Sequence, residues 1–373
     1  MIPLVFPDYN NSLLNLVNSI LKYYNVDLGY NGLKSLNNIL KKDYKNVIFF
    51  LIDGLGLEII KNHHETCIFL NESITDEITS VFPSTTVAAT TTAITGLPPI
   101  TTGWIGWQQY FKEENRNVVL FLNKDYYDEE YEFNYNISEK YIKTTNIYEL
   151  ISRANPQIRT HEVFPEFKTK EHDSIDSQVN SIKKICDSCE ENFIYAYWDK
   201  LDVLLHEHGV GSLEVKNHLF EIEEAIKKLK DDLDEDSLII LTADHGQIDI
   251  EGIELWNYDD IISLLKQKPA IESRATAFYI KDGFDELFEE TFNKHFYGKF
   301  ILYKTEDLIK TGLFGKGEIH PKVSEFLGDY FAIAIDKYSF RLQEAKHTHK
   351  ATHAGLTKSE MMIPLITFTG RNK

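Results

Sequence analysis

Short apolar runs separated by helical patterns organise this chain. Each run has the length of a buried β-strand, and the segments at 11–24 and 212–233 have the periodicity of helices, the second with a charged, solvated face. The clearest runs are residues 47–52, 193–198, 238–242 and 362–368. The alternation predicts an α/β fold with a mostly parallel central sheet flanked by helices.

Two other stretches are expected to leave this sheet. Residues 112–141 are dense in Glu, Asn and Tyr apart from an apolar run at 118–122, and we expect this excursion to border the functional site. Residues 265–345 carry their own strand and helix signals, at 277–280, 284–295 and 330–335. We predict that 265–345 is an inserted α+β cap subdomain, and that 1–264 and 346–373 form the core.

Composition and charge narrow the class of protein. The 373 residues are 43% hydrophobic, enough for a large core. A net charge of -19 argues against a nucleic-acid-binding surface, so a phosphorylated substrate needs a concentrated positive site. Because no apolar run approaches the roughly 20 residues of a membrane span, and the first residues do not resemble a signal peptide, we expect a cytoplasmic protein without a membrane partner.

The cysteines suggest no site of their own. Cys67, Cys186 and Cys189 are too few for a disulfide framework, so reduced thiols are expected. Cys186 and Cys189 have CxxC spacing, but no second pair completes a thiolate metal site. We interpret that spacing as chance on an amphipathic helix.

Potential metal ligands follow two of the predicted strands. Asp53 ends the first run, before Gly54, and Asp244 and His245 end the third. Ligands collect at the carboxyl ends of strands in open α/β sheets. A turn-capping role explains Asp53 equally well. The Asp-His pair is harder to explain by packing, because unpaired polar groups at a buried strand end are costly.

A hydroxyl-rich segment predicts the start of a helix. Pro83 and the residues after it resemble a helix N-terminus, and Gly96 its end. First-turn hydroxyl groups lie beside free backbone amides and the positive end of the helix dipole, which favours phosphate. Taken singly, Ser84, Thr85 and Thr86 are each better explained as an N-cap than as a nucleophile.

A second set of ligand-type residues follows the run at 193–198. Asp202 and His206 are four residues apart, so one turn of helix places both on one face, spaced for a shared metal such as zinc or manganese. An ordinary ion pair is the alternative. His353 precedes the last strand and competes with His347 and His349, and its assignment depends on the other segments.

Together these segments resemble the alkaline phosphatase superfamily, most closely its branch of type I phosphodiesterases and nucleotide pyrophosphatases. The likeness lies in the order, spacing and context of five elements across nearly the whole chain. It implies an alkaline-phosphatase-like fold and two divalent metals, most simply zinc. By this resemblance one metal is held by Asp53, Thr86, Asp244 and His245, and the other by Asp202, His206 and His353.

The resemblance also implies a mechanism and a substrate class. Thr86 takes the place of the nucleophile, attack on phosphorus gives a phosphothreonine, and water bound at the second metal releases it. The expected activity is hydrolysis of phosphodiester or pyrophosphate bonds in a small phosphorylated substrate, with a nucleotide as one candidate. Three alternatives stay open: a phosphomonoesterase, a phosphoryl-transferring mutase, and a catalytically silent metal-binding protein. A sulfatase is disfavoured because no cysteine takes the nucleophile position.

Two departures from the family pattern concern substrate binding and a local turn. Trp107 stands where pyrophosphatase-type members carry a phosphate-binding asparagine. Gln108 as a substitute donor, or Trp104 and Trp107 as an aromatic wall, are both open, beside a purely structural role for the two tryptophans. Leu201 replaces the proline that normally precedes the ligand at Asp202. In the cap, Arg274, Lys316 and His320 are candidate anion contacts, with solvated surface as the favoured account of each.

Overall fold

The computed structural model describes residues 2–128, 130–165, 172–344 and 348–371. Six strands form a central sheet in the order β2-β17-β8-β1-β7-β6. β6, β7, β1 and β8 run parallel, whereas β17 is antiparallel to both of its neighbours. The strands are β1 Asn46–Ile52, β2 Ile74–Thr79, β6 Arg159–Val163, β7 Asn192–Trp198, β8 Ser237–Thr242 and β17 Met362–Thr369. Each predicted apolar run lies within one of them, which confirms the mostly parallel sheet.

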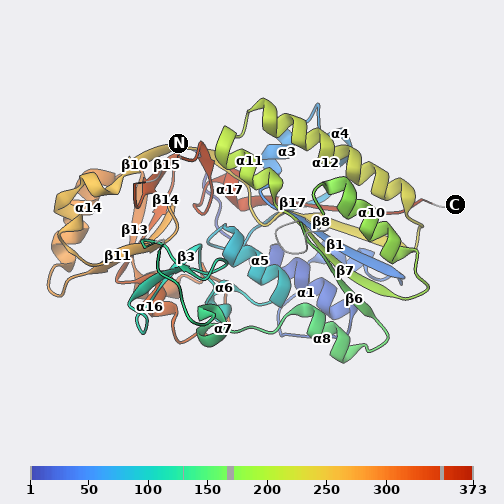
Figure 1. Cartoon of the computed structure of the whole chain (residues 1–373), viewed down its shortest axis with the longest axis horizontal. Helices are drawn as coiled ribbons and strands as arrows, with labels where there is room; N and C mark the ends of the chain where they lie inside the picture. The colour runs from blue at the N-terminus through green and yellow to red at the C-terminus, as the bar shows by residue number, and fades with distance from the viewer. Residues whose placement is uncertain (1, 129, 166–171, 345–347, 372–373) are drawn as a thin grey trace.

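Helices cover both faces of the central sheet. Every residue of β1, β7 and β8 is buried, as expected for parallel strands enclosed on both sides. In Figure 1, α10 and α12 lie above the sheet and α1, α5 and α8 below it. These helices are α1 Leu13–Tyr23, α5 Thr86–Thr95, α8 Ile147–Ala154, α10 Ile175–Cys186 and α12 Leu213–Asp232. The helices expected at 11–24 and 212–233 are therefore confirmed.

A second, antiparallel sheet has the order β13-β14-β12-β11-β3-β4-β5 and stands beside the first (Figure 1). Its strands are β3 Gln108–Phe111, β4 Arg116–Val119, β5 Lys124–Asp125, β11 Leu265–Ile271, β12 Ala275–Ile280, β13 Phe300–Lys304 and β14 Tyr330–Ala334. The excursion at 112–141 thus contributes to the sheet that contains most of the predicted cap. The assignment of 265–345 as a subdomain stays a prediction, since β3, β4 and β5 come from outside that range.

Shorter elements complete the chain. Two small ladders pair β9 Ile248–Asp249 with β16 Ala351–Thr352, and β10 Glu251–Glu254 with β15 Tyr338–Arg341. The remaining helices are α2 Lys34–Ile39, α3 Leu57–Asn62, α4 Ile68–Glu72, α6 Pro99–Thr102, α7 Ile137–Tyr141, α11 Lys200–His208, the 3-10 turn Leu255–Asn257, α13 Asp259–Ile262, α14 Asp285–Phe296, α15 Thr305–Lys310, α16 Val323–Leu327 and α17 Lys358–Met361. Among the described helices, none is both long and apolar enough to cross a bilayer.

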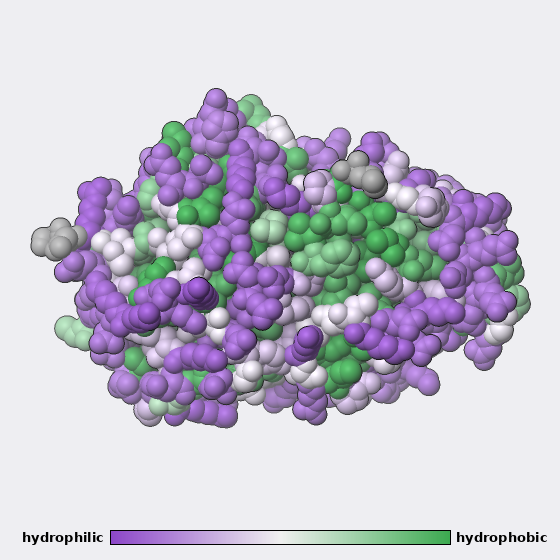
Figure 2. Space-filling view, turned by 180° about the vertical axis from the view of Figure 1, so that it is seen from behind, coloured by the Kyte–Doolittle hydropathy of each residue, from purple (hydrophilic) through white to green (hydrophobic). Residues whose placement is uncertain are grey.

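The surface and the cysteines agree with an acidic, globular chain. Seen from behind, polar and charged side chains cover most of the face, apart from an apolar area near its middle (Figure 2). All three cysteines are free. Burial raises the pKa of the Cys67 and Cys186 thiols to about 12, so neither is a reactive thiolate at neutral pH.

Arg274, which we expected to be solvated surface, is instead buried at the second sheet. Its side chain is fully buried, and its guanidinium donates to both carboxylate oxygens of Glu360, at 2.7 and 2.8 Å. A third nitrogen, Nη1, donates to the carbonyl oxygens of Asp336 and Tyr338. All three guanidinium nitrogens therefore have hydrogen-bond acceptors. Arg274 therefore joins the second sheet to the end of the chain and is no anion contact.

Replacing Arg274 with leucine should destabilise the fold strongly. Glu360 would be left as an unpaired buried carboxylate, a situation that costs about 3–5 kcal/mol. Urea unfolding of Arg274→Leu checks this, with Lys337→Ala as control because Lys337 pairs with Glu251 at the surface. The double variant Arg274→Leu/Glu360→Leu should recover part of the loss. Equal, small effects for Arg274→Leu and the control would contradict the role of the pair.

Candidate active site

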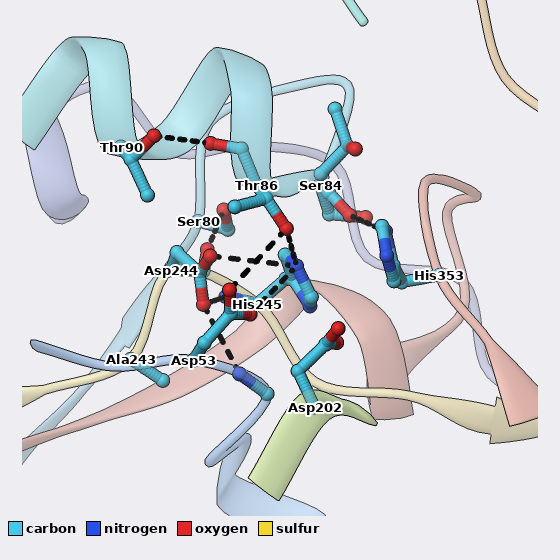
Figure 3. Close-up of polar contacts among 12 residues, drawn as sticks. Asp53, Ser80, Ser84, Thr86, Thr90, Asp202, Ala243, Asp244, His245 and His353 are labelled. Atoms are coloured by element: carbon cyan, nitrogen blue, oxygen red, sulfur yellow. Dashed lines mark hydrogen bonds and ion pairs between the residues drawn. The ribbon is translucent and has the colours of Figure 1, made fainter. Parts of the chain in front are cut away.

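Three ligand-type side chains meet where β1 and β8 end. Asp53 follows β1, and Asp244 and His245 follow β8, the parallel neighbour of β1. All three are buried, and their candidate ligand atoms lie within 4.8 Å of one another. His245 Nε2 is 3.4 Å from Asp53 Oδ1 and 3.4 Å from Asp244 Oδ2 (Figure 3). We call Asp53, Asp244 and His245 the inner group.

Glycines allow the two strand ends to approach this closely. A Cβ on Gly56 would lie 2.4 Å from Gly246 Cα, and one on Gly246 would lie 2.1 Å from the carbonyl oxygen of Ser359. Both distances are far below van der Waals contact. The loops after β1 and β8 can therefore pack on each other only because neither residue has a side chain.

Thr86 lies above the inner group as the first residue of α5. Its Oγ1 is 3.1 Å from His245 Nε2 and 3.5 Å from Asp53 Oδ2 (Figure 3). Thr85 precedes it as the N-cap residue, and no side-chain capping bond forms there. Thr86 is therefore the hydroxyl at the helix start that faces the inner group. The alternative explanation of Thr86 as an N-cap is wrong, because Thr85 is the N-cap residue.

A second set of ligand-type residues comes from α11 and the segment after β16. Asp202 Oδ2 lies 3.3 Å from His206 Nε2, one helical turn away. With His353 they place three ligand atoms within 4.8 Å of one another. We call Asp202, His206 and His353 the outer group. The rings of His353 and His245 stack at 3.8 Å between centroids, so the two groups are adjacent.

Backbone pairing brings His353 to this position. β16 pairs with β9, which follows His245, and His353 is the next residue after β16. His353 Nδ1 is 3.2 Å from the carbonyl oxygen of Ser84, just before α5. The ring of its competitor His349 packs against that of His206, tilted by 54° with 4.3 Å between the centroids, but His349 belongs to neither group of candidate ligands among the described residues. His347 lies outside those residues.

The inner carboxylates occupy an electrostatically costly position. Burial, and then the charges of Asp244 and Asp202, raise the pKa of Asp53 well above its usual value. Burial also raises the pKa of Asp244, although His245 opposes it. Asp53 Oδ1 and Asp244 Oδ2 have no hydrogen-bond partner among the described residues. Two such oxygens beside an imidazole nitrogen suit a divalent cation, so these residues fit a bound metal.

The outer group holds an ion pair of its own. Burial works against ionisation of Asp202, but the imidazoles of His206, His353 and His245 together lower the pKa of its carboxyl. Burial likewise opposes protonation of His206, but Asp202, the bond to the Ala351 carbonyl oxygen and Glu272 together raise the pKa of its imidazole. Burial and then His245 hold the pKa of His353 well below its usual value. A neutral imidazole is the form that binds metal.

A cavity of about 780 Å³ opens over the outer group, between the two sheets. Thr86, Asp202, His206 and His353 line it, whereas the inner group lies beneath its floor. Trp107 and Gln108 also line the cavity. Gln108, the candidate donor, and Trp107, one of the two tryptophans of the predicted aromatic wall, are thus both at the cavity.

The other candidate substrate contacts lie elsewhere. Trp104 is absent from the cavity lining, and its indole N–H donates to the carbonyl oxygen of Ile142 at 2.8 Å. Lys316 is exposed, as expected, and His320 is half-buried beside a separate, smaller cavity. The aromatic wall of two tryptophans therefore reduces to Trp107 alone.

Three polar contacts of the site escaped the sequence analysis. The Tyr197 hydroxyl donates to Asp53 Oδ2, and the Gln247 amide donates to Asp202 Oδ1. The sequence positions of Tyr197, just before Trp198, and of Gln247, two residues after His245, could have indicated that both lie at the site. No sequence signal pointed to Glu272, which reaches the cavity from the loop between β11 and β12.

The site and fold are those of a metal-dependent phosphoester hydrolase of the alkaline phosphatase superfamily. The family model of type I phosphodiesterase/nucleotide pyrophosphatase matches residues 47–356, and the chain belongs to this family. That range includes both groups and Thr86. No curated protein sequence matches the chain significantly.

Solved structures agree on the fold. Human ectonucleotide pyrophosphatase/phosphodiesterase 5 is similar with a TM-score of 0.64 and 19% identity, over 86% of this chain and 87% of that one. An inactive variant of the murine protein, in complex with AMP, matches with a TM-score of 0.63 and 17% identity, over 87% of each chain. Phosphonoacetate hydrolase from Sinorhizobium meliloti 1021, in complex with phosphonoformate, matches with a TM-score of 0.61 and 15% identity, over 86% of this chain and 89% of that one. At such identities these matches establish architecture.

Glu272 makes the stability of the metal-free protein depend on pH. Burial raises the pKa of this carboxyl from 4.5 to about 7, so it stays protonated in the fold where the unfolded chain has already ionised. Stability is therefore lost as pH rises from 4.5 to about 7. The stability of Glu272→Gln relative to the unsubstituted protein should increase across that window, by about 3 kcal/mol at most. Urea unfolding at pH 4 and pH 8 measures the difference, and a pH-independent difference would contradict the assignment.

Proposed function

We propose that this protein hydrolyses phosphodiester or pyrophosphate bonds, with Thr86 as the nucleophile. The observation that carries the proposal is the position of Thr86 Oγ1, 3.1 Å from His245 Nε2 at the open end of a helix. A threonine hydroxyl is a weak nucleophile unless a neighbouring group or a metal favours loss of its proton. A metal held by Asp53, Asp244 and His245 would lie beside Thr86 Oγ1 and favour loss of its proton.

Two divalent metals, most simply zinc with manganese as the alternative, complete the proposed site. Asp53, Asp244, His245 and Thr86 would hold one, and the outer group the other. Bound there, such a pair supplies Lewis acidity for the attacking and leaving oxygens of an in-line displacement. Two observations support these sites. Asp53 Oδ1 and Asp244 Oδ2 are buried without a hydrogen-bond partner among the described residues, and both groups consist of carboxylates and imidazoles, which bind such metals.

The chain's own residues would position the substrate and protect the site. The first amides of α5 have no acceptor within the helix and point toward the side where Thr86 lies, so they can donate to phosphate oxygens. Thr90 Oγ1 donates to the carbonyl oxygen of Thr86 and ties the nucleophile to the next turn. The Tyr197 hydroxyl and the Gln247 amide hold Asp53 and Asp202 in orientation.

The reaction we propose has two displacements at phosphorus. Thr86 Oγ1 loses its proton and forms a bond to phosphorus while the bond to the leaving oxygen breaks, which gives a phosphothreonine. Water then attacks the same phosphorus and releases Thr86. The geometry at Thr86 supports the first displacement most directly, because its hydroxyl is oriented by His245 and Asp53.

Thr86→Ala should abolish turnover of bis-p-nitrophenyl phosphate by the zinc-loaded protein, because no other hydroxyl takes its position. Thr86→Ser should keep a measurable part of it, since the hydroxyl remains. We expect a loss of at least about 1,000-fold in kcat for the alanine variant. Thr92→Ala in the same helix is the control, because the Thr92 hydroxyl has no hydrogen-bond partner among the described residues. Turnover unchanged by Thr86→Ala would refute the mechanism, and faster cleavage of p-nitrophenyl phosphate would favour a monoesterase.

Metal uptake can be measured separately from activity. After chelation and dialysis against zinc, the protein should bind two ions and melt at a higher temperature, because a ligand bound only by the fold stabilises it. Asp244→Asn should lose one ion and keep the other. Asp27→Asn is the control, because Asp27 lies at the surface, where it pairs with Lys22 and accepts from the backbone N–H of Gly29. Failure to bind any zinc would refute the proposed metal sites.

A further inference from the structure

Glu272 lies at the wall of the cavity, next to the start of the helix from which Thr86 points to the inner group (Figure 3). Its Oε1 accepts from the Thr85 hydroxyl at 2.6 Å and from the Trp107 backbone N–H at 2.7 Å. Thr85 directly precedes Thr86, and all four residues line the cavity. The carboxyl group of Glu272 is therefore held beside the place where the phosphate of the proposed substrate would meet Thr86.

The backbone of the β11–β12 loop fixes Glu272 from both sides. The Glu272 N–H donates to the carbonyl oxygen of Ala275 at 3.0 Å, and the Glu272 carbonyl oxygen accepts from the Thr276 hydroxyl at 2.6 Å. Ile271 has a φ of 81°, a left-handed value that is an outlier for a β-branched residue. Strain of this kind persists where the surrounding structure over-determines it, often at ligand sites. The position of Glu272 is thus set by the loop and not only by its own rotamer.

The second oxygen of this carboxyl group is free. Glu272 is partly exposed, and its Oε2 keeps accessible surface while it makes no hydrogen bond to any described residue. Because Oε1 already accepts two hydrogen bonds, a proton on the carboxyl group is best placed on Oε2. In its neutral form Glu272 therefore presents an O–H donor to the cavity.

The surroundings of Glu272 favour that neutral form. Burial raises the pKa of the carboxyl from 4.5 to about 7, although the bonds from Thr85 and Trp107 oppose it. Of the nearby charges, His206 lowers this pKa and Asp202 raises it. The other titratable side chains that line the cavity are Tyr126, Glu254, Arg341, Glu344, His349 and His353, of which Glu254 and Arg341 pair with each other. A phosphodiester anion bound beside the carboxyl would disfavour a second negative charge there and raise its pKa further.

The neighbouring donors on this wall are already used. The Thr85 hydroxyl and the Trp107 N–H both donate to Glu272, as described above. Gln108 is 1% exposed, and its amide nitrogen donates to the carbonyl oxygen of Pro269 at 3.4 Å. Among these residues, the O–H group of a neutral Glu272 is therefore the donor left for a substrate.

We propose that Glu272 acts as a neutral carboxylic acid and donates a hydrogen bond from Oε2 to a non-bridging oxygen of the bound phosphodiester. The inference rests on the function proposed above and adds a substrate-contacting residue to the same site. A donor fixed in this way stabilises negative charge on the phosphate oxygens without reorganisation of the wall. Ionisation of Glu272 removes the donor and brings a like charge to the phosphate, so substrate binding weakens as the pH rises.

Binding of bis-p-nitrophenyl phosphate to the zinc-loaded Thr86→Ala protein tests this. Isothermal titration calorimetry measures the affinity, and without Thr86 the diester should bind without being cleaved. The diester keeps one negative charge at neutral and alkaline pH, so its own titration does not contribute. Its affinity should fall at least about 10-fold as the pH rises above about 7, the size expected when a hydrogen bond to a charged group is lost.

Variants of Glu272 on the Thr86→Ala background identify the group responsible. Glu272→Gln keeps an acceptor for Thr85 and Trp107 and a donor at the position of Oε2, so its affinity should stay high and lose the fall with pH. Glu272→Leu removes the donor and should bind weakly at every pH. Glu344→Gln is the control, because Glu344 is an exposed carboxyl of the same cavity, and it should keep the fall.

The possible outcomes separate this inference from the proposed function. An affinity that does not fall with pH in the Thr86→Ala protein would overturn the inference without any variant of Glu272. An equal fall in Glu272→Gln, or tighter binding by Glu272→Gln even at low pH, would overturn it as well. In each of these cases the phosphodiesterase function stands.

Two further outcomes concern the function itself. Cleavage of the diester by the Thr86→Ala protein would refute the nucleophile, and the pH dependence of KM for the same diester would then decide the role of Glu272. If the zinc-loaded protein does not bind the diester at all, the proposed function and the role of Glu272 both fail.

Discussion

The confinement of three carboxylates at one edge of a buried sheet is the constraint on which the rest of this structure depends. Asp53 and Asp244 follow adjacent parallel strands, and Asp202 faces them from the helix after a third. Burial raises the pKa of both strand-end carboxyls, so the protein alone does not neutralise them. Burying such charges is tolerated only with a compensating cation. The fold holds ready a site that a divalent metal completes.

Several unrelated features of the chain make sense as supports for that confinement. Gly56 and Gly246 let two loops touch, and the Tyr197 hydroxyl orients Asp53. Glu360 accepts from the backbone N–H groups of Gly355 and Thr357, and Arg274 holds it from the second sheet. The segment that begins at His353 is thereby fixed to both sheets. The catalytic geometry and the stability of the second sheet are therefore coupled.

The second sheet contributes chemistry as well as support. The start of its strand β3 and the β11–β12 loop provide one wall of the cavity, with Trp107, Gln108 and Glu272. The central sheet and the helices packed on it provide Thr86 and most of the candidate ligands, all within the range that the family model matches. The candidate ligands and most of the cavity wall that contains Glu272 therefore come from different parts of the fold.

From the sequence alone, ligand-type residues could be assigned to the ends of strands whose apolar patterns are strong, and the resemblance to the family joined them into one candidate site. Asp53, Asp244 and Asp202 could be placed from the order of strands and the helical spacing to His206. Glu272, the burial of Arg274 and the removal of Trp104 from the site were decided only by tertiary structure. These depend on how the second sheet pairs over distances of more than a hundred residues, as between Gln108 and Ile271. Local periodicity contains no information about such pairing, because it reports which face of an element is buried and not what covers it.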